Sequence, residues 1–277
     1  MSILENIKRQ ASARNKCVVL PEGEDKRVVA AAAATVNEGV ARVILLGDAD
    51  KIAADNPDVD LSKVTVVNPV TYEKTEAYAE LLFKAREGKI NKKTGLPEYA
   101  DVSFAKAAIL KDYTMYGALM LKAGDADGLV SGACHSTANT LRPGLQVIKT
   151  APGVNTVSSC FIMIAPEGEH KYNPDGVAVF ADCAINIEPD AQQLADIAIS
   201  SAETAKTIAG IEPRVAMLSF STKGSGNDDK FFKSVPKMQQ ATALAKTAAP
   251  DLALDGEFQF DAAVAPEVGK LKAPGSA

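Results

Sequence analysis

The chain has 277 residues, of which 47% are hydrophobic and 23% are charged, and its formal net charge is −5. These values are typical of a globular protein with one large or two medium domains, and the acidic balance with no Trp argues against nucleic-acid binding. No apolar run of about 18 residues predicts a membrane span, and four scattered cysteines with two histidines argue against a zinc site and for a cytoplasmic protein.

Apolar runs of strand length alternate with helical patterns along the chain. After a predicted amphipathic helix at the N-terminus, the predicted strands are 17–20, 42–46, 64–67, 128–130, 157–164, 177–180 and 214–220. The predicted helices are 24–38, 71–87, 102–122, 135–149, 190–209 and 230–248. This alternation predicts an α/β fold with a mainly parallel sheet.

Gly- and Pro-rich stretches indicate the domain organisation. The stretch near 141–148 interrupts the alternation and predicts two α/β domains, 1–143 and 144–277. The polar stretches 86–100 and 167–176 predict loops, and His170 falls in the second. The ending GKLKAPGSA has a loop composition, so we expect neither a helix nor a strand there.

The first stretch with chemical potential follows the predicted strand 128–130. Ser131 and Gly132 end that strand and lead into a helix, so unpaired backbone N–H groups and the helix dipole favour an anion. Arg142 would add a planar charged group suited to phosphate. The alternative is a plain strand–turn–helix with capping hydroxyls and one surface arginine.

Three other stretches share part of this character. Residues 221–227 place hydroxyls, glycines and Lys223 after the strand 214–220, where open α/β sheets bind ligands, although a flexible loop fits equally. In 21–27 the acidic residues suit a helix start, and Arg27 faces either a cleft or water. If residues 255–261 are extended, three polar side chains lie on one side of the segment. The alternative is an ordinary solvated strand edge.

The sequence offers few good candidates for the usual catalytic side chains. His135 precedes a helix and is either a cap-region or a cleft residue. Cys134 and Cys160 fit small buried side chains better than nucleophiles. The glycine-rich loops, one in each predicted domain, instead favour a cleft that holds a phosphorylated ligand.

Together these stretches resemble one family, the phosphate acetyltransferases and the related phosphate butyryltransferases. The motifs that carry the resemblance are PEGEDKR at 21–27, ADGLVSGACHSTANTLRPGLQVIKTAPG at 126–153, VFADCAIN at 179–186, LSFSTKGS at 218–225 and DGEFQFDAA at 255–263. The resemblance is colinear over essentially the whole chain, and the long central block has the acetyl form.

The resemblance implies an enzyme that moves an acetyl group between coenzyme A and phosphate, with no metal and with CoA as a substrate rather than a cofactor. It implies two α/β domains with a cleft between them, as in isocitrate and isopropylmalate dehydrogenases but without a nicotinamide, and a homodimer. It places catalysis at Ser131 and Arg142. The substrate-binding residues it implies are Gly132, His135, Arg27, Arg86, Thr222, Lys223 and Ser225.

The resemblance also implies a departure from the family. Family chains continue after KAPGSA with a segment that carries a Ser-Arg pair and a thiol-activating aspartate and closes the first domain. We therefore expect weak or absent activity and an under-packed first domain. The alternatives are a non-catalytic module that binds CoA or an acyl phosphate, a phosphate butyryltransferase and, less favoured, a dehydrogenase of the related fold.

Overall fold

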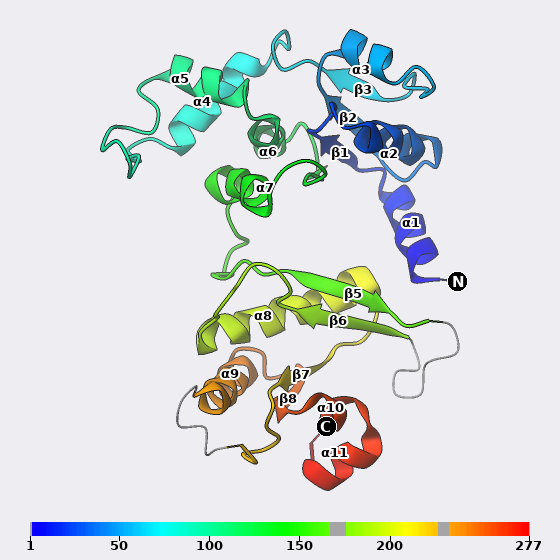
Figure 1. Ribbon diagram of the computed structural model, residues 1–277, viewed down its shortest axis with the longest axis vertical. Helices are drawn as coiled ribbons and strands as arrows, with labels where there is room; N and C mark the ends of the chain where they lie inside the picture. Colours follow the sequence, from blue (N-terminus) through cyan, green and yellow to red (C-terminus); the bar gives the residue numbers. More distant parts are fainter. Residues whose placement is uncertain (1, 167–175, 227–232, 277) are drawn as a thin grey trace. The chain divides into compact units, whose positions relative to one another are not determined.

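The computed structural model describes residues 2–166, 176–226 and 233–276, so the predicted loop 167–176, with His170, lies almost entirely outside the described residues. The chain divides into two compact units, Met1–Lys149 and Thr150–Ala277, and each is described by itself (Figure 1). Among the described helices, none combines the length and the apolar character needed to cross a bilayer.

The first unit contains a four-stranded parallel sheet in the order β3-β2-β1-β4. Its strands are β1 (Cys17–Leu20), β2 (Arg42–Leu46), β3 (Thr65–Val67) and β4 (Gly128–Leu129). Its helices are α1 (Ile3–Arg14), α2 (Lys26–Asn37), α3 (Ala49–Asp55), α4 (Thr75–Ala85), α5 (Val102–Ile109), α6 (Tyr113–Ala123), α7 (Thr137–Pro143) and the π-helical η1 (Gly144–Ile148). This sheet confirms the predicted α/β fold.

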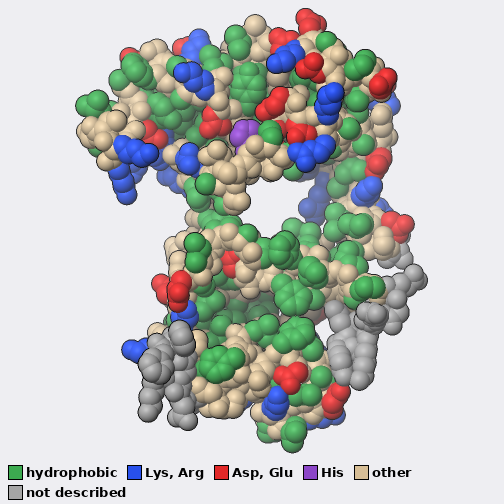
Figure 2. Space-filling view, in the orientation of Figure 1, with side chains coloured by type: hydrophobic (Ala, Val, Ile, Leu, Met, Phe, Trp, Pro, Cys, Tyr) green, Lys and Arg blue, Asp and Glu red, His purple; other side chains and the backbone are tan. Residues whose placement is uncertain are grey.

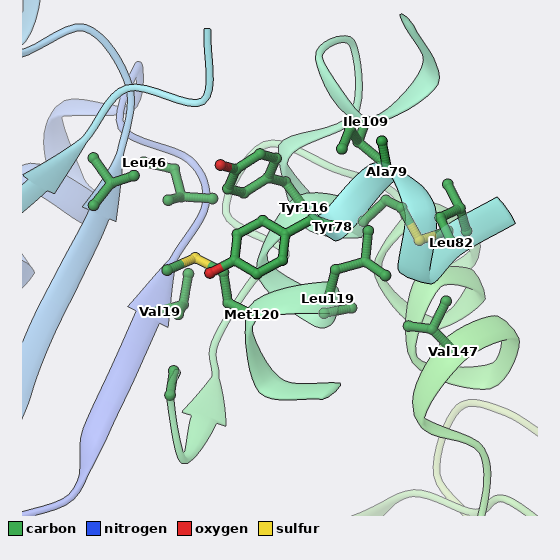
Figure 3. Packing of buried hydrophobic residues seen from close by; sticks show 14 of the residues in the cluster. Val19, Leu46, Tyr78, Ala79, Leu82, Ile109, Tyr116, Leu119, Met120 and Val147 are labelled. Carbon is green, nitrogen blue, oxygen red and sulfur yellow. The ribbon is translucent and has the colours of Figure 1, made fainter. Parts of the chain in front are cut away.

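Alternation along the strands gives the sheet two apolar faces, as expected for a parallel sheet that is buried on both sides. Val19 and Leu46 pack with α4, α5, α6 and η1, whereas Leu20 and Leu45 pack with α2 and α3. Figure 3 shows the first of these clusters, in which Tyr116 and its neighbours fill the space beside β1 and β2.

Two buried tyrosines order the first cluster. The rings of Tyr78 and Tyr116 meet edge to face, with centroids 5.2 Å apart. The Tyr78 hydroxyl donates to Asp125, and the Tyr116 hydroxyl lies 2.7 Å from Oγ1 of Thr75, which itself donates to the carbonyl of Pro69. The hydroxyls of both buried tyrosines therefore have partners, as buried polar groups require.

Two predicted helices of the first unit need correction. The single helix expected over 102–122 is two helices, because Asp112 accepts the N–H of Met115 and caps a new helix, α6. The helix expected over 135–149 begins as α7, capped by Ser136, and continues after Pro143 as the π-helical η1. Proline has no N–H for the α-helical ladder, which explains the change of winding there.

The second unit contains two separate strand pairs. Its elements are β5 (Cys160–Ile164), β6 (Val177–Ala181), α8 (Ala191–Thr204), the π-helical η2 (Ala205–Ala209), β7 (Arg214–Leu218), α9 (Ser234–Ala248), β8 (Ala253–Phe258), α10 (Phe260–Val264) and α11 (Pro266–Lys272). β7 and β8 pair parallel, but β5 and β6 pair antiparallel, so the parallel pattern does not extend to them. The loop expected over the last residues, GKLKAPGSA, is wrong in its first part, since α11 begins before it with proline at its first position and ends at Lys272.

Small residues bring the helices of the second unit together. Ala195 and Ala198 of α8 pack with Ala241 and Ala245 of α9 over β7 and β8. In contrast, Phe161 and Met163 of β5 are more than half exposed, at 56% and 51%. Figure 2 shows hydrophobic side chains gathered on the surface over β5 and β6.

Candidate active site

The predicted anion-binding turn after β4 is already occupied by a carboxylate of the protein. Glu22, which follows β1, is only 1% exposed. Its Oε2 accepts the N–H groups of Gly132 and Ala133 at 2.9 and 3.0 Å, and its Oε1 accepts the N–H of Cys134 at 3.0 Å. The prediction that these backbone donors are unpaired is therefore wrong.

Local sequence explains why Glu22 can reach this turn. The chain passes so close to β2 at Gly23 that a Cβ there would lie 2.3 Å from the carbonyl oxygen of Leu46. Asp25 then caps α2 by accepting the N–H of Arg27. The glycine and the cap fix the path between β1 and α2, and they hold Glu22 beneath the neighbouring loop.

Hydrogen bonds fix the protonation states around Glu22. Burial acts to raise the pKa of Glu22, but the donors from Cys134, His135, Ala133 and Gly132 hold that pKa at about 2. An ionised carboxylate only accepts, so Nδ1 of His135, 2.6 Å from Oε1, carries the hydrogen. Desolvation and the contacts with Glu22 raise the pKa of the Cys134 thiol to about 12, which makes it a poor nucleophile.

The same three side chains also offer atoms that could bind a metal ion. A carboxylate oxygen of Glu22, the sulfur of Cys134 and a ring nitrogen of His135 lie within 4.8 Å of one another. However, the hydrogen bonds among them use Glu22 Oε1 and His135 Nδ1, which are atoms that a metal ion would need. Hydrogen bonding alone therefore explains why these side chains lie together.

The predicted loop of the second unit has the same design. Glu257, also 1% exposed, accepts the N–H of Gly224 at 2.6 Å and the hydroxyl of Ser221 at 2.9 Å. Thr222 is buried and accepts the N–H of Gln259, while Oγ of Ser225 accepts the N–H of Thr222. These groups hold the loop together, and their predicted contact with a substrate stays a prediction.

Lys223 is paired within the second unit. Its Nζ lies 2.7 Å from Asp255 and 2.8 Å from the carbonyl of Gly256, and it stands 4.9 Å above the centre of the Phe258 ring. Lys246 contacts the same carboxylate at 2.7 Å. Burial opposes ionisation of Asp255, but the hydrogen bonds from these two lysines lower its pKa. Side-chain exposure of Lys223 is 39%, so part of its ammonium group still faces solvent.

A third carboxylate fills its own loop after β6. Asp182 accepts the N–H groups of Ala184, Ile185 and Asn186 and the hydroxyl of Ser159. Burial acts to raise the pKa of Asp182, but these hydrogen bonds lower it well below its usual range. Asp182 therefore stabilises its loop by accepting backbone N–H groups, as Glu22 and Glu257 do.

The three predicted arginines differ in how they are held. Arg27 forms two hydrogen bonds to Asp25 and a third, of 2.7 Å, to the carbonyl of Ala133, and its side chain is 74% exposed. Arg86 is largely buried and pairs with Glu98 at 2.6 Å, across the predicted loop 86–100. Arg142 on α7 is exposed and makes no hydrogen bond or ion pair with any residue that the structure describes.

Ser131 lies beside these groups at the end of β4. Its hydroxyl is 3.3 Å from that of Thr114 on α6. Two surface hollows, of about 460 Å³ at the start of β1 and β2 and about 260 Å³ beside β5 and α8, lie elsewhere. Neither is lined by Ser131, His135 or Arg142.

Comparison with known proteins places this arrangement in a family. The model described as "Phosphate acetyl/butaryl transferase" matches residues 2–277. The chain is 46% identical over 277 residues to the phosphate acetyltransferase of Thermoanaerobacterium thermosaccharolyticum. The matched region covers 100% of this chain and 79% of that relative. This chain belongs to the phosphate acetyl/butyryl transferase family.

Further comparisons agree with this assignment. The phosphate acetyltransferase of Acetivibrio thermocellus is 44% identical over 276 residues, or 100% of this chain and 78% of the relative. A crystal structure of a phosphotransacetylase from Streptococcus pyogenes superposes with a TM-score of 0.86 at 42% identity, covering 100% of this chain and 79% of that one. The fold described above is therefore that of the transferase family.

Within this transferase, the structure separates two classes of predicted residues. Gly132, Thr222, Ser225, Arg27 and Arg86 contribute to contacts that hold the loops in place. Arg142 alone among the predicted arginines presents an unpaired guanidinium, in the part of the chain that the structure describes. Whether a substrate contacts any of these residues stays a prediction.

Sequence reasoning missed the role of Glu22. An acidic residue just before a helix interacts favourably with the positive end of the helix dipole. This explains Glu24 and Asp25, but it does not predict that Glu22 is buried. The signal that could have found Glu22 is its place between the end of an apolar strand and Gly23, where the chain is not yet helical.

Proposed function

We propose that this chain is a phosphate acetyltransferase, which moves an acetyl group between CoA and inorganic phosphate. The observation that carries this conclusion is 46% identity over all 277 residues to a relative named phosphate acetyltransferase. The structure supports the choice of site, because Arg142 is exposed and has no partner among the described residues. It lies on α7, the helix that follows β4, and the ends of parallel strands are where such folds bind ligands.

The proposed reaction needs charge neutralisation more than a covalent catalyst. The CoA sulfur attacks the carbonyl carbon of acetyl phosphate and the C–S bond forms. The bond between that carbon and the oxygen that bridges to phosphorus breaks, and the leaving phosphate takes up the proton of the thiol. Arg142 would hold the phosphate through its planar fork and make it a better leaving group. Ser131 would donate its hydroxyl hydrogen to the oxygen that gains charge, an effect worth about 3–4 kcal/mol for one well-placed donor.

Internal carboxylates shape this proposal. Glu22 takes three backbone N–H groups of the first predicted loop, and Glu257 takes that of Gly224 in the second. We therefore propose that the phosphate meets side chains rather than a backbone cradle. The predicted cleft, the homodimer and the cytoplasmic location rest on the resemblance and on the sequence, and they stay predictions.

The exposed apolar face of β5 and β6 supports the homodimer. Phe161, Met163 and Phe180 are exposed there by 56%, 51% and 39%, and apolar patches of this kind mark protein interfaces. We expect light scattering to give twice the chain mass, and Phe161→Asp to shift the protein toward monomer. A monomeric wild-type chain would rule out this part of the proposal.

The direct test is to mix the chain with CoA and acetyl phosphate and to follow the thioester, with phosphate measured in the same sample. We expect one phosphate released for each acetyl-CoA formed, and slower transfer from butyryl phosphate. Binding of CoA without thioester formation from either acyl phosphate would instead favour a non-catalytic binding module.

A further inference from the structure

We propose that Glu22 is a positioning residue for acetyl transfer, because it fixes His135 in the tautomer that carries hydrogen on Nδ1. This inference rests on the proposed function for its kinetic part, but its structural part holds for the folded chain whether or not it turns over. No reaction step is assigned to Glu22 itself, since it is 1% exposed and cannot contact a substrate.

The geometry fixes the position of one hydrogen, the one on Nδ1 of His135. Glu22 is a carboxylate with a pKa of about 2, so both its oxygens act as acceptors. Oε1 lies 2.6 Å from Nδ1 of His135, which must therefore donate. In the neutral imidazole the other nitrogen, Nε2, then has a lone pair, and the imidazole side chain is 33% exposed.

The Cys134 thiol is consistent with the same arrangement. Its sulfur lies 3.4 Å from Oε1 of Glu22 and 3.6 Å from Nδ1 of His135. Because its pKa is about 12, the thiol keeps its hydrogen, and since Nδ1 already carries a hydrogen, the thiol donates to a carboxylate. That carboxylate is either Glu22 or Glu24, whose Oε1 lies 3.5 Å from the sulfur. The thiol therefore leaves the Nδ1–H of His135 to Glu22.

The consequence for the reaction is a fixed acceptor on the loop that follows Ser131 and leads into α7, the helix that carries Arg142. A neutral His135 with hydrogen on Nε2 would offer the substrates a donor, whereas the tautomer set by Glu22 offers an acceptor. CoA brings a thiol hydrogen, so an acceptor at this position would orient the thiol. Glu22 also ties down Gly132 and Cys134, so the ring and its loop are held by the same side chain.

Nitrogen NMR on the full chain labelled with ¹⁵N tests the structural part without any need for activity. We expect His135, assigned by comparison with His135→Gln, to show the pattern of a protonated Nδ1 and an unprotonated Nε2 wherever its imidazole is neutral. Glu22→Gln should move it toward the Nε2–H tautomer. Glu24→Gln is the matched control, since it removes the same charge from an exposed neighbour that contacts the sulfur of Cys134, at 3.5 Å, and not His135.

The wild-type spectrum alone decides the proposal if Glu22→Gln fails to fold. A wild-type His135 with hydrogen on Nε2 overturns it, and so does an unchanged tautomer in a folded Glu22→Gln chain. A correct tautomer in a chain without transferase activity would leave this assignment standing and would refute the proposed function instead.

Kinetics then test whether the tautomer matters for transfer. Removing the partner that orients a functional histidine costs about 10–100-fold in metal sites, and we expect about a tenfold loss of kcat/KM for Glu22→Gln. If Glu22 acts through His135, then His135→Gln costs much less in the Glu22→Gln background than in the wild type. Fully additive losses would contradict a shared role.

Discussion

Arg142→Gln should remove activity and leave stability unchanged. Arg142 is exposed and has no partner among the described residues, so its replacement should alter the free energy of unfolding by no more than about 0.5 kcal/mol. If its fork holds the phosphate with two charged hydrogen bonds worth about 1.5–3 kcal/mol each, the loss in kcat/KM is at least about a hundredfold.

Arg86→Gln is the matched comparison with the opposite expected result on stability. Arg86 pairs with Glu98 at 2.6 Å, and both side chains are about four-fifths buried, with 19% and 20% exposed. Breaking this pair leaves Glu98 without its partner and should cost about 1.5–3 kcal/mol. The chain has no Trp, so urea unfolding is best followed by far-UV circular dichroism, with initial rates of acetyl-CoA formation measured on the same samples.

Arg142→Lys refines the experiment, because it keeps the charge but loses the planar fork. We expect it to recover only part of the activity lost in Arg142→Gln. Two results would refute the reasoning: a loss of more than about 1 kcal/mol in the unfolding free energy of Arg142→Gln, or a rate within twofold of the wild type.

Three further predictions follow from buried hydrogen bonds and shifted pKa values. Thr75→Val should lower the free energy of unfolding by about 1–3 kcal/mol more than Tyr116→Phe does, because it leaves the buried Tyr116 hydroxyl without an acceptor. Equal losses for the two variants on urea unfolding would contradict this. Glu22 has a pKa lowered from 4.5 to about 2, so its stabilisation is full above pH 4.5 and is lost as pH falls toward 2; the gap in unfolding free energy between wild type and Glu22→Gln should shrink by about 3 kcal/mol over that range, and a constant gap would be inconsistent with the lowered pKa. Cys134 should react slowly with iodoacetamide at pH 8 because its pKa is about 12, and peptide mapping that shows labelling as fast as that of glutathione would count against the network around Glu22.

Sequence patterns predicted the first unit better than the second. The four strands of the parallel sheet were found because strands such as Cys17–Leu20 and Arg42–Leu46 are short apolar runs bounded by turn signals. The antiparallel pairing of β5 with β6 was missed, because both strands are apolar runs whose direction depends on how the chain returns between them. Apolar composition carries no information about strand direction.

Sequence patterns selected the loops after β4 and β7 as candidate sites but did not predict the side chains that fill them. Loop composition after β4 and β7 correctly indicates strand ends with many hydrogen-bond donors. It does not indicate what accepts them, because Glu22 and its partner Gly132 are 110 residues apart and Glu257 and Gly224 are 33 apart. Contacts over such separations arise only from the fold, so the carboxylates that fill the two loops could not be read from local patterns.

Binding of acetyl phosphate tests most directly the claim that the Arg142 side chain, rather than a backbone cradle, holds the phosphate. Calorimetric titration into the wild type and into Arg142→Gln, without CoA, isolates this step. The account predicts that the variant binds at least about tenfold more weakly, which corresponds to about 1.4 kcal/mol. Equal affinities for the two proteins would contradict it.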